Sequence, residues 1–187
     1  MRIAKFLAAA GVASRRKCEE IILEGNVKVN GKTVEELGMQ VDPERDDIRV
    51  NRKKIELKQE KIYIMFNKPV GCVCTCEDDR GRTTVLDYIK GIDERIYPVG
   101  RLDFTTEGLL ILTNDGDLAF RLTHPSNEVN KRYLAIVDSE ITSDDVRKIE
   151  KGVFIDGGKT APAKVKLLKV SPTRTELTII IHEGRNR

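Results

Sequence analysis

One acidic residue, Asp103, stands where a carboxylate could do chemistry. It lies between the apolar residues Leu102 and Phe104, next to Arg101, and shortly before the unbroken apolar run 109–112. That run ends at turn-forming residues, which is typical of a strand buried on both faces. Burial raises the pKa of a carboxyl and a neighbouring cation lowers it, and such opposed influences are typical of reactive acids. The alternative is that Asp103 only caps its own loop, as Asp often does.

The composition is that of a globular protein with one locally charged region. The chain has 187 residues, of which 40% are hydrophobic, enough for the cores of one ordinary domain and one small domain. It has no apolar run long enough to cross a membrane and no signal-peptide pattern, which predicts a cytoplasmic protein. The net charge of +3 is small, but in residues 1–32 seven basic residues face three acidic ones. The positive excess is therefore local and N-terminal.

The four cysteines indicate reduced structural thiols. One is isolated, and the other three alternate along a predicted strand at 72–76, so they point to one side of it. Neighbours on one strand have poor geometry for a disulfide, and both histidines are isolated from the cysteines. The sequence therefore predicts no disulfide and no metal site. The cysteines are Cys18, Cys72, Cys74 and Cys76.

The first part of the chain predicts two short helices. Apolar residues recur at helical spacing over residues 3–10, and Gly11 stops that helix. Ser14 is placed to cap the N-terminus of a second helix, and Gly25 to end it in a left-handed conformation. A small sheet should follow at once.

That sheet is predicted from one turn and two apolar segments. The Asn-Gly pair at 30–31 is typical of a tight β-hairpin. Residues 48–50 and 55–57 are predicted as closing strands. The stretch 58–61 is a linker too short to let two domains move far apart.

Three cations occupy the first turn of the second predicted helix. They are Arg15, Arg16 and Lys17, and the helix dipole disfavours cations at this end by a few tenths of a kcal/mol each, roughly. An anionic partner would explain them, because exposed amides and added cations at a helix start attract phosphate. The alternative is a solvated charged face.

The rest of the chain predicts an α+β domain around a mixed, largely antiparallel sheet. Strands outnumber helices and are joined by short turns. The predicted strands are 62–66, 72–76, 109–112, 133–137, 165–170 and 176–181. The predicted helices are a short one capped by Thr84, one at 118–122 and one at 143–151.

Three stretches near the N-terminus resemble the S4-like RNA-binding domain. They are Arg2-Ile-Ala-Lys-Phe-Leu7, Gly11-Val-Ala-Ser-Arg-Arg16 and Gly25-Asn-Val-Lys-Val-Asn-Gly31. The resemblance implies a small α/β RNA-binding domain over residues 1–60. It also implies that one surface of this domain binds RNA. The residues implied are Ser14, Arg15, Arg16 and Lys17, with Lys5 and Lys28 as weaker candidates.

The second part resembles the RsuA-like family of ribosomal RNA pseudouridine synthases. The motifs are Asn67-Lys-Pro-Val-Gly71, Gly81-Arg-Thr-Thr-Val85, Gly100-Arg-Leu-Asp-Phe-Thr-Thr-Glu-Gly-Leu109, Lys131-Arg-Tyr133 and Glu183-Gly-Arg-Asn-Arg187. The resemblance implies a catalytic domain over residues 61–187. Two further motifs, Tyr97-Pro-Val-Gly-Arg-Leu102 and Leu122-Thr-His-Pro125, favour the branch that acts on large-subunit rRNA. The family's last motif continues beyond Arg187, so a shortened C-terminus is expected.

The resemblance implies an isomerase that converts rRNA uridines to pseudouridine without a cofactor. Asp103 would act on the sugar or on the uracil ring of a flipped nucleotide, Tyr133 would stack on the uracil and help remove its carbon-5 proton, and Arg185 would pair with Asp103. Arg101 would reach into the RNA near that nucleotide. The implied partner is ribosomal RNA or a ribosome-assembly intermediate. The protein is expected to act as a monomer.

Each of these roles has an alternative that requires no chemistry. Tyr133 could be an ordinary strand aromatic and Arg185 a surface charge. The chain as a whole could be a non-catalytic rRNA-binding or ribosome-assembly protein, although Asp103, Tyr133 and Arg185 together favour the enzyme. The nearby Asp115 sits in a turn, and a role in capping the backbone explains it.

Overall fold

The computed structural model describes residues 1–57, 60–155 and 158–182. The chain divides into two compact units, Met1–Ala119 and Phe120–Arg187. The domain boundary predicted after residue 60 falls inside the first unit and stays a prediction. No helix within the described ranges is long and apolar enough to cross a bilayer.

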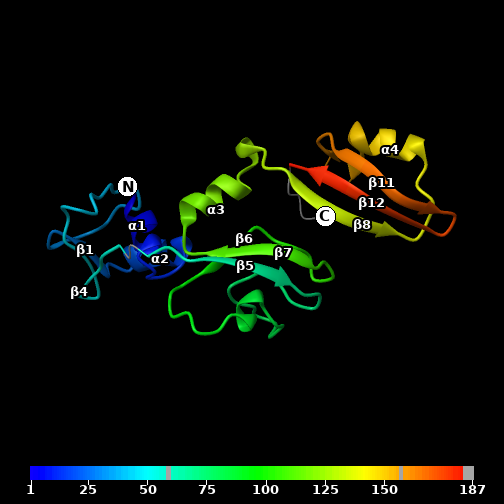
Figure 1. The fold of residues 1–187 in the computed structure, drawn as a ribbon. Coiled ribbons are helices and arrows are strands. Elements are labelled where there is room, and N and C mark those ends of the chain that lie inside the picture. Colours follow the sequence, from blue (N-terminus) through cyan, green and yellow to red (C-terminus); the bar gives the residue numbers. More distant parts are fainter. Residues whose placement is uncertain (58–59, 156–157, 183–187) are drawn as a thin grey trace. The chain divides into compact units, whose positions relative to one another are not determined.

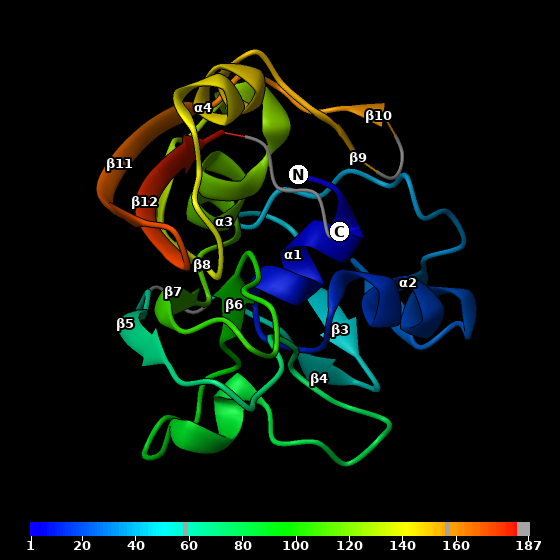
Figure 2. The same cartoon turned by 90° about the vertical axis from the view of Figure 1, so that its right-hand side faces the viewer.

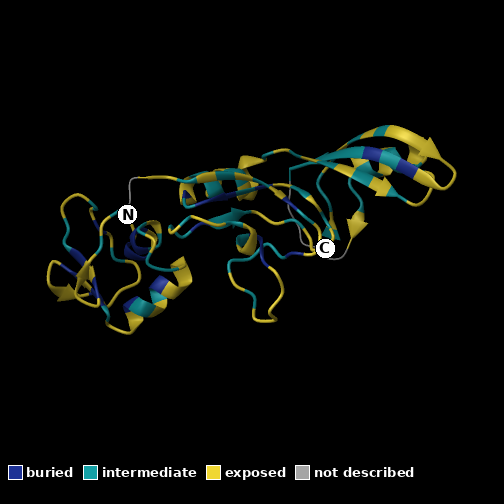
Figure 3. Cartoon of the chain, turned by 60° about the horizontal axis from the view of Figure 1, so that its bottom comes forward, coloured by how far each residue is buried: buried dark blue, intermediate teal, exposed yellow. Residues whose placement is uncertain are grey.

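The first unit begins with two helices and a four-stranded antiparallel sheet (Figure 1). The predicted caps are present: the Lys17 amide donates to the Ser14 hydroxyl at 3.2 Å, and Gly25 has a φ of +74°. Both helices and the sheet enclose one apolar core, visible as the buried positions of the N-terminal helices in Figure 3. The elements are α1 (Ile3–Ala9), α2 (Arg15–Leu23), β1 (Val27–Val29), β2 (Lys32–Thr33), β3 (Ile48–Val50) and β4 (Lys53–Lys54), in sheet order β2-β1-β3-β4.

The closing strand predicted at 55–57 is wrong, because the strand lies at Lys53–Lys54. Asn51 and Arg52 both have positive φ, 47° and 69°. They form a tight turn, so β4 pairs with β3 directly after it. Residues 55 and 57 pack against the core without forming a strand.

A three-stranded antiparallel sheet forms the rest of the first unit. Its strands are β5 (Tyr63–Lys68), β6 (Tyr97–Val99) and β7 (Gly108–Thr113), with β7 in the middle. The 3₁₀ helix η1 (Val85–Tyr88) follows Thr84, the predicted cap, whose amide donates to the Asp87 carboxylate at 2.7 Å. The core beside this sheet comprises Cys72, Val85, Ile96, Leu110 and Leu112.

Strand β7 is not buried along the whole of both faces, so the prediction of burial on both faces is wrong at Leu109. Leu110 and Leu112 are 3% and 0% exposed, whereas Leu109 is 65% exposed. The described core of this sheet lies on the side of Leu110 and Leu112. An unbroken apolar run does not reveal which of its alternating side chains will find packing partners.

The strand predicted at 72–76 is also absent. Only an isolated parallel bridge joins Val73 to Thr84, and the Thr75 amide turns back to the Val73 carbonyl oxygen at 3.1 Å. The segment is a folded loop, and all four cysteines of the chain are unpaired thiols.

The second unit contains an antiparallel sheet in the order β11-β12-β8. Figure 2 shows α4 beside β11, and the α4 cap is formed by Thr142, whose hydroxyl accepts from the Asp145 amide at 3.2 Å. The helix α3 starts in the first unit and ends in the second. The elements are α3 (Gly116–Thr123), η2 (Pro125–Asn127), β8 (Lys131–Val137), α4 (Ser143–Glu150), β9 (Phe154–Ile155), β10 (Gly158–Lys159), β11 (Lys164–Ser171) and β12 (Arg174–Ile181). The predicted α+β class with a largely antiparallel sheet is confirmed.

Candidate active site on the loop before strand β7

The loop 100–107, which carries Asp103, is a defined turn between β6 and β7. It is bracketed by Gly100 and Gly108, whose φ angles of +82° and +127° are conformations that glycine adopts without strain. Inside it, the Thr106 amide donates to the Asp103 carbonyl oxygen at 3.0 Å. The loop therefore has its own hydrogen-bonded shape.

A fully buried lysine, Lys68, forms hydrogen bonds to the main chain of this loop. The Nζ of Lys68, at the end of β5, donates to the carbonyl oxygens of Pro69 at 3.0 Å, Asp103 at 3.0 Å and Thr106 at 2.8 Å. An ammonium group has three N–H donors, and here each has an acceptor. A buried cation is costly unless it is hydrogen-bonded in this way, so Lys68 is a strong tie between β5 and the loop.

The segment after β5 adds two further ties. The Gly71 amide donates to the Phe104 carbonyl oxygen at 2.8 Å. The Cys74 thiol lies 3.3 Å from both the amide nitrogen and the carbonyl oxygen of Leu102. The main chain of residues 102, 103, 104 and 106 is thus held by neighbours that lie far away in sequence.

The Asp103 carboxylate itself is exposed, so the expected burial is not found. Its side chain makes no hydrogen bond or ion pair with any residue in the described part of the chain. The physical reason is that the loop turns its carbonyl groups inward to Lys68, which leaves the side chain on the surface. The result is a carboxylate on a fixed backbone whose oxygen atoms have no partner among the described residues. Arg101, on the same loop, is also exposed.

The other two predicted catalytic residues belong to parts of the chain other than the Asp103 loop. Tyr133 lies in β8 of the second unit, partly buried and paired with Ile179 of β12. Arg185 lies outside the described residues. The grouping of Asp103, Tyr133 and Arg185 stays a prediction.

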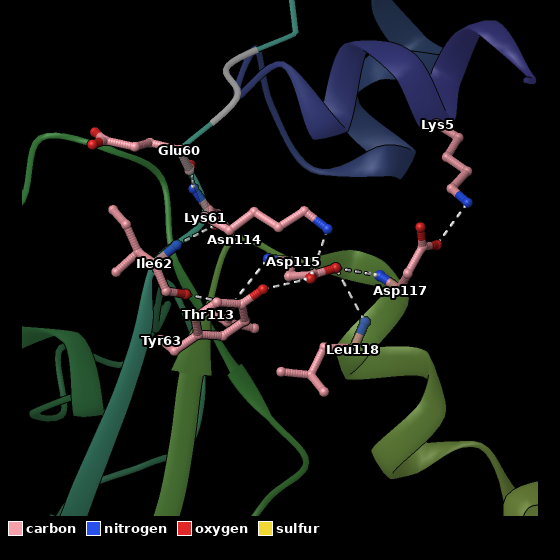
Figure 4. Close-up of polar contacts among 10 residues, drawn as sticks. All are labelled: Lys5, Glu60, Lys61, Ile62, Tyr63, Thr113, Asn114, Asp115, Asp117 and Leu118. Carbon is pink, nitrogen blue, oxygen red and sulfur yellow. Dashed lines mark hydrogen bonds and ion pairs between the residues drawn. The ribbon is translucent and has the colours of Figure 1, made fainter.

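A second carboxylate, Asp115, lies after the other end of β7 and has many partners (Figure 4). It is 8% exposed. Its oxygens accept from the Lys61 Nζ at 2.8 Å and the Tyr63 hydroxyl at 2.9 Å. They also accept from the amides of Asp117 at 3.0 Å and Leu118 at 3.1 Å. The predicted backbone role is confirmed, since these amides belong to the first turn of α3.

The contacts of Asp115 have an electrostatic consequence. Burial acts to raise the pKa of this carboxyl, but the hydrogen bonds from Lys61, Leu118, Tyr63 and Asp117 outweigh it and lower the pKa to about 2. The same contacts raise the pKa of Lys61 and of Tyr63, in both cases chiefly through the hydrogen bond to Asp115. Sequence reasoning missed Lys61 and Tyr63 because each lies more than fifty positions away from Asp115.

The predicted RNA-binding residues of the N-terminal region lie on its surface. The Ser14 hydroxyl serves as the cap of α2, and the three following cations occupy the first turn as predicted. Lys17 pairs with Glu20 at 2.7 Å, which raises the pKa of Lys17. Lys5 pairs with Asp117 at 2.8 Å, and Lys28 is exposed on β1. Their role in RNA binding stays a prediction.

Two family models match the chain. A model described as RNA pseudouridylate synthase matches residues 62–187, and the S4 domain model matches residues 1–48. Together they account for most of the chain.

Individual relatives agree with these models. A ribosomal large subunit pseudouridine synthase B from Bacillus subtilis is 50% identical over 188 residues, which cover 100% of this chain and 76% of that protein. An uncharacterized RNA pseudouridine synthase from Aquifex aeolicus is 46% identical over 187 residues, which cover 99% of this chain and 74% of that protein. A solved structure described as a crystal structure of pseudouridylate synthase is similar with a TM-score of 0.65 at 28% identity, covering 100% of this chain and 79% of that one.

Proposed function

The chain belongs to the RNA pseudouridylate synthase family, with an S4 domain in front, and we propose that it isomerises specific uridines of large-subunit ribosomal RNA. The resemblance read from its motifs is confirmed, and the family favours the enzyme over a non-catalytic RNA-binding protein. The proposed substrate rests on the Bacillus subtilis relative, which is named for the large ribosomal subunit.

The reaction sets two physical requirements. The bond between the ribose and uracil nitrogen-1 breaks, the base turns and the ribose joins carbon-5. The carbon-5 proton leaves and nitrogen-1 gains one, so the product is an isomer of the substrate. No electrons are gained or lost overall, and water must be kept from the separated base. A stacked or paired uridine hides the bond that breaks, so the nucleotide must be flipped out first.

The observation that carries the proposal is the state of Asp103. Its backbone is fixed by Lys68 while its carboxylate is exposed and makes no bond to the described protein. A carboxylate held in this way can attack the ribose or the ring of a bound nucleotide, because little rearrangement of the loop is needed.

The remaining roles extend this proposal to other residues. Tyr133 stacks on the detached uracil and assists removal of the carbon-5 proton. Arg185 pairs with the Asp103 carboxylate as its counter-ion. Arg101, exposed on the Asp103 loop, contacts the RNA beside the flipped nucleotide.

The S4 domain supplies affinity, mainly through phosphates. Cations at the start of α2 lie beside the amides of its first turn, an arrangement that attracts phosphate oxygens. The proposed contacts are Ser14, Arg15, Arg16, Lys17, Lys28 and Lys5. We also propose that the enzyme acts as a monomer in the cytoplasm, on rRNA or on a ribosome-assembly intermediate.

The experiment that tests the function measures tritium release from RNA labelled at uracil carbon-5. Fragments of large-subunit and small-subunit rRNA are compared under single-turnover conditions, with Asp103→Asn as the inactive control. Release from a large-subunit fragment only is the expected result. Release from small-subunit fragments alone would overturn the proposed substrate, and equal release by Asp103→Asn would overturn the role of Asp103.

A further inference from the structure

Two aromatic rings at the end of α3 form a stacked pair that is open to solvent. The ring centroids of Phe120 and His124 lie 4.5 Å apart, with an angle of 35° between the ring planes. Phe120 is 55% exposed, and His124 is exposed as well. His124 belongs to the motif Leu122-Thr-His-Pro125, which the proposed reaction does not use. Because burial of aromatic surface is favourable, such an exposed pair is a candidate contact surface.

Hydrogen bonds hold this aromatic pair in place. The His124 amide donates to the Phe120 carbonyl oxygen at 2.9 Å, which extends the helical pattern to His124. The side-chain amide of Asn127 donates to the carbonyl oxygens of Phe120 at 3.3 Å and Arg121 at 3.0 Å. The Nδ1 atom of His124 lies 2.7 Å from the Ser126 hydroxyl oxygen. The backbone beneath the pair and the orientation of the imidazole are therefore fixed before any ligand binds.

The contacts of His124 also decide which ring nitrogen carries the proton. Its Nδ1 accepts from the Ser126 amide at 3.3 Å, so the neutral imidazole has its proton on Nε2. Among the described residues, Nε2 has no hydrogen-bond partner. The pair thus offers a ligand an N–H donor in the plane of one ring as well as aromatic faces.

The charge around the pair suits an anionic polymer. Residues 118–127 contain one charged side chain, Arg121, and no carboxylate that would repel a phosphate. Arg121 is exposed, and within the described ranges its guanidinium forms no ion pair. Aromatic faces beside a cation and an N–H donor are the combination that binds nucleotides whose bases are not stacked in a helix.

We propose that Phe120 and His124 form a stacking site for an unpaired base of the RNA, at a nucleotide other than the target uridine. This inference rests on the proposed function, because RNA is the ligand. The nucleotide lies in a loop or bulge, since a base inside a duplex is already stacked on both faces. Arg121 contacts its phosphate, and the Nε2 proton of His124 is donated to its base edge or backbone. The site therefore selects RNA with a single-stranded segment.

The first test compares the binding of two RNA hairpins of equal length. One carries an open loop of unpaired rRNA sequence, and in the other the same sequence is paired within the stem. Fluorescence anisotropy gives Kd for the parent, Phe120→Ala, Phe120→Tyr and Phe120→Leu. Phe120→Ala should weaken binding of the open-loop hairpin roughly 5- to 150-fold, which corresponds to about 1–3 kcal/mol for one base–aromatic stack. Its effect on the paired hairpin should be several-fold smaller.

The conservative variants separate stacking from apolar packing. Phe120→Tyr keeps the ring and should bind the open-loop hairpin like the parent. Phe120→Leu keeps apolar volume without a ring and should bind as weakly as Phe120→Ala. Circular dichroism of each variant reports whether α3 stays folded.

The second test detects the stacked base directly. The chain contains no tryptophan, so Phe120→Trp introduces a single indole whose fluorescence responds to a base stacked on it. The open-loop hairpin should quench this fluorescence, and the paired hairpin should not. Phe154→Trp is the matched control, because Phe154 is 81% exposed in the same unit and has no aromatic neighbour in the described structure. Its fluorescence should change little with either RNA.

Four results would overturn the inference while leaving the proposed function intact. They are an unchanged affinity of Phe120→Ala for the open-loop hairpin, an equal loss of affinity for both hairpins, an unchanged affinity of Phe120→Leu, and equal quenching in Phe120→Trp and Phe154→Trp. A parent protein that releases no tritium from any labelled rRNA fragment would instead count against the proposed function.

Discussion

The two ends of strand β7 each carry an aspartate, and the two are used in opposite ways. Asp115, after the strand, is 8% exposed and accepts hydrogen bonds from two side chains and two amides. Asp103, before the strand, has its main-chain oxygen bound by Lys68 and its carboxylate exposed. At one end the protein binds the side chain, and at the other it binds the backbone. Residue type alone does not separate a structural carboxylate from a reactive one, whereas the location of its hydrogen bonds does.

The largest effect on turnover is expected when Asp103, the exposed aspartate before β7, is changed. Asp103→Asn keeps the shape of the side chain but removes its negative charge, so turnover should fall by roughly 10³-fold or more. Stability should change by less than about 0.5 kcal/mol, because the carboxylate has no partner in the described protein. Tritium release and urea denaturation of the same preparations test both statements. A strong loss of stability would mean that Asp103 is a structural carboxylate like Asp115.

The next largest effect is expected when Lys68, which binds the main chain of the Asp103 loop, is replaced. Lys68→Met keeps the apolar stem but removes the buried ammonium donor from three carbonyl oxygens, which should destabilise the protein by about 3 kcal/mol. Turnover by the molecules that stay folded should also fall, because Asp103 would no longer be held in position. Denaturation curves and single-turnover rates at low temperature separate these effects. Unchanged turnover in the folded fraction would show that the loop keeps its shape without Lys68.

A smaller effect is expected when Asp115, the buried aspartate after β7, is changed. Asp115→Asn loses the charge-assisted bonds from Lys61 and from the α3 amides, so stability at neutral pH should fall by about 2 kcal/mol. Turnover per folded molecule should change far less than in Asp103→Asn. If turnover falls as steeply as in Asp103→Asn, the assignment of Asp115 as structural and of Asp103 as reactive is contradicted.

The same carboxylate predicts how stability depends on pH. The pKa of Asp115 is about 2 in the folded protein. In the unfolded chain it is about 3.9, the value for a model peptide. Its contribution is therefore fully present above about pH 4 and is lost as the pH falls toward 2. Unfolding curves between these pH values should show a smaller loss for Asp115→Asn than for the parent. Asp78, whose pKa the Arg82 guanidinium likewise holds at about 2, should still titrate in both.

The smallest effect is expected at the exposed ion pair between Lys5 and Asp117. Lys5 and Asp117 are 2.8 Å apart, with side chains that are 46% and 66% exposed, so Lys5→Ala should change stability by less than about 1 kcal/mol. If Lys5 also contacts phosphate, the slope of log affinity against log salt should fall by about 0.9 or less. An unchanged slope would assign Lys5 to the ion pair alone.

Local patterns made much of this fold predictable. The caps at Ser14 and Thr84 and the Asn30-Gly31 hairpin depend on residues within a few positions, and the structure contains all of them. The chemistry at Asp103 was inferred from a motif, because its residues are contiguous.

What could not be predicted depends on distant partners. Lys68 reaches carbonyl oxygens 35 and 38 positions away, and nothing in its neighbourhood marks it as buried. The exposure of Leu109 likewise depends on which face of β7 the rest of the chain covers. The predicted strand at 72–76 failed for a similar reason, since that segment folds onto the Asp103 loop and leaves no partner strand.

The tie made by Lys68 has a consequence for how this enzyme could be re-engineered. All three of its acceptors are main-chain oxygens, which every amino acid provides. Side chains of the loop can therefore be exchanged without removing the bonds that hold it, provided that its glycines remain. Libraries at positions 101, 104 and 105 should yield folded proteins at high frequency, with a common placement of the carboxylate and altered preferences for the surrounding nucleotides. A loop secured through its backbone is a scaffold on which new sequence selectivity can be evolved.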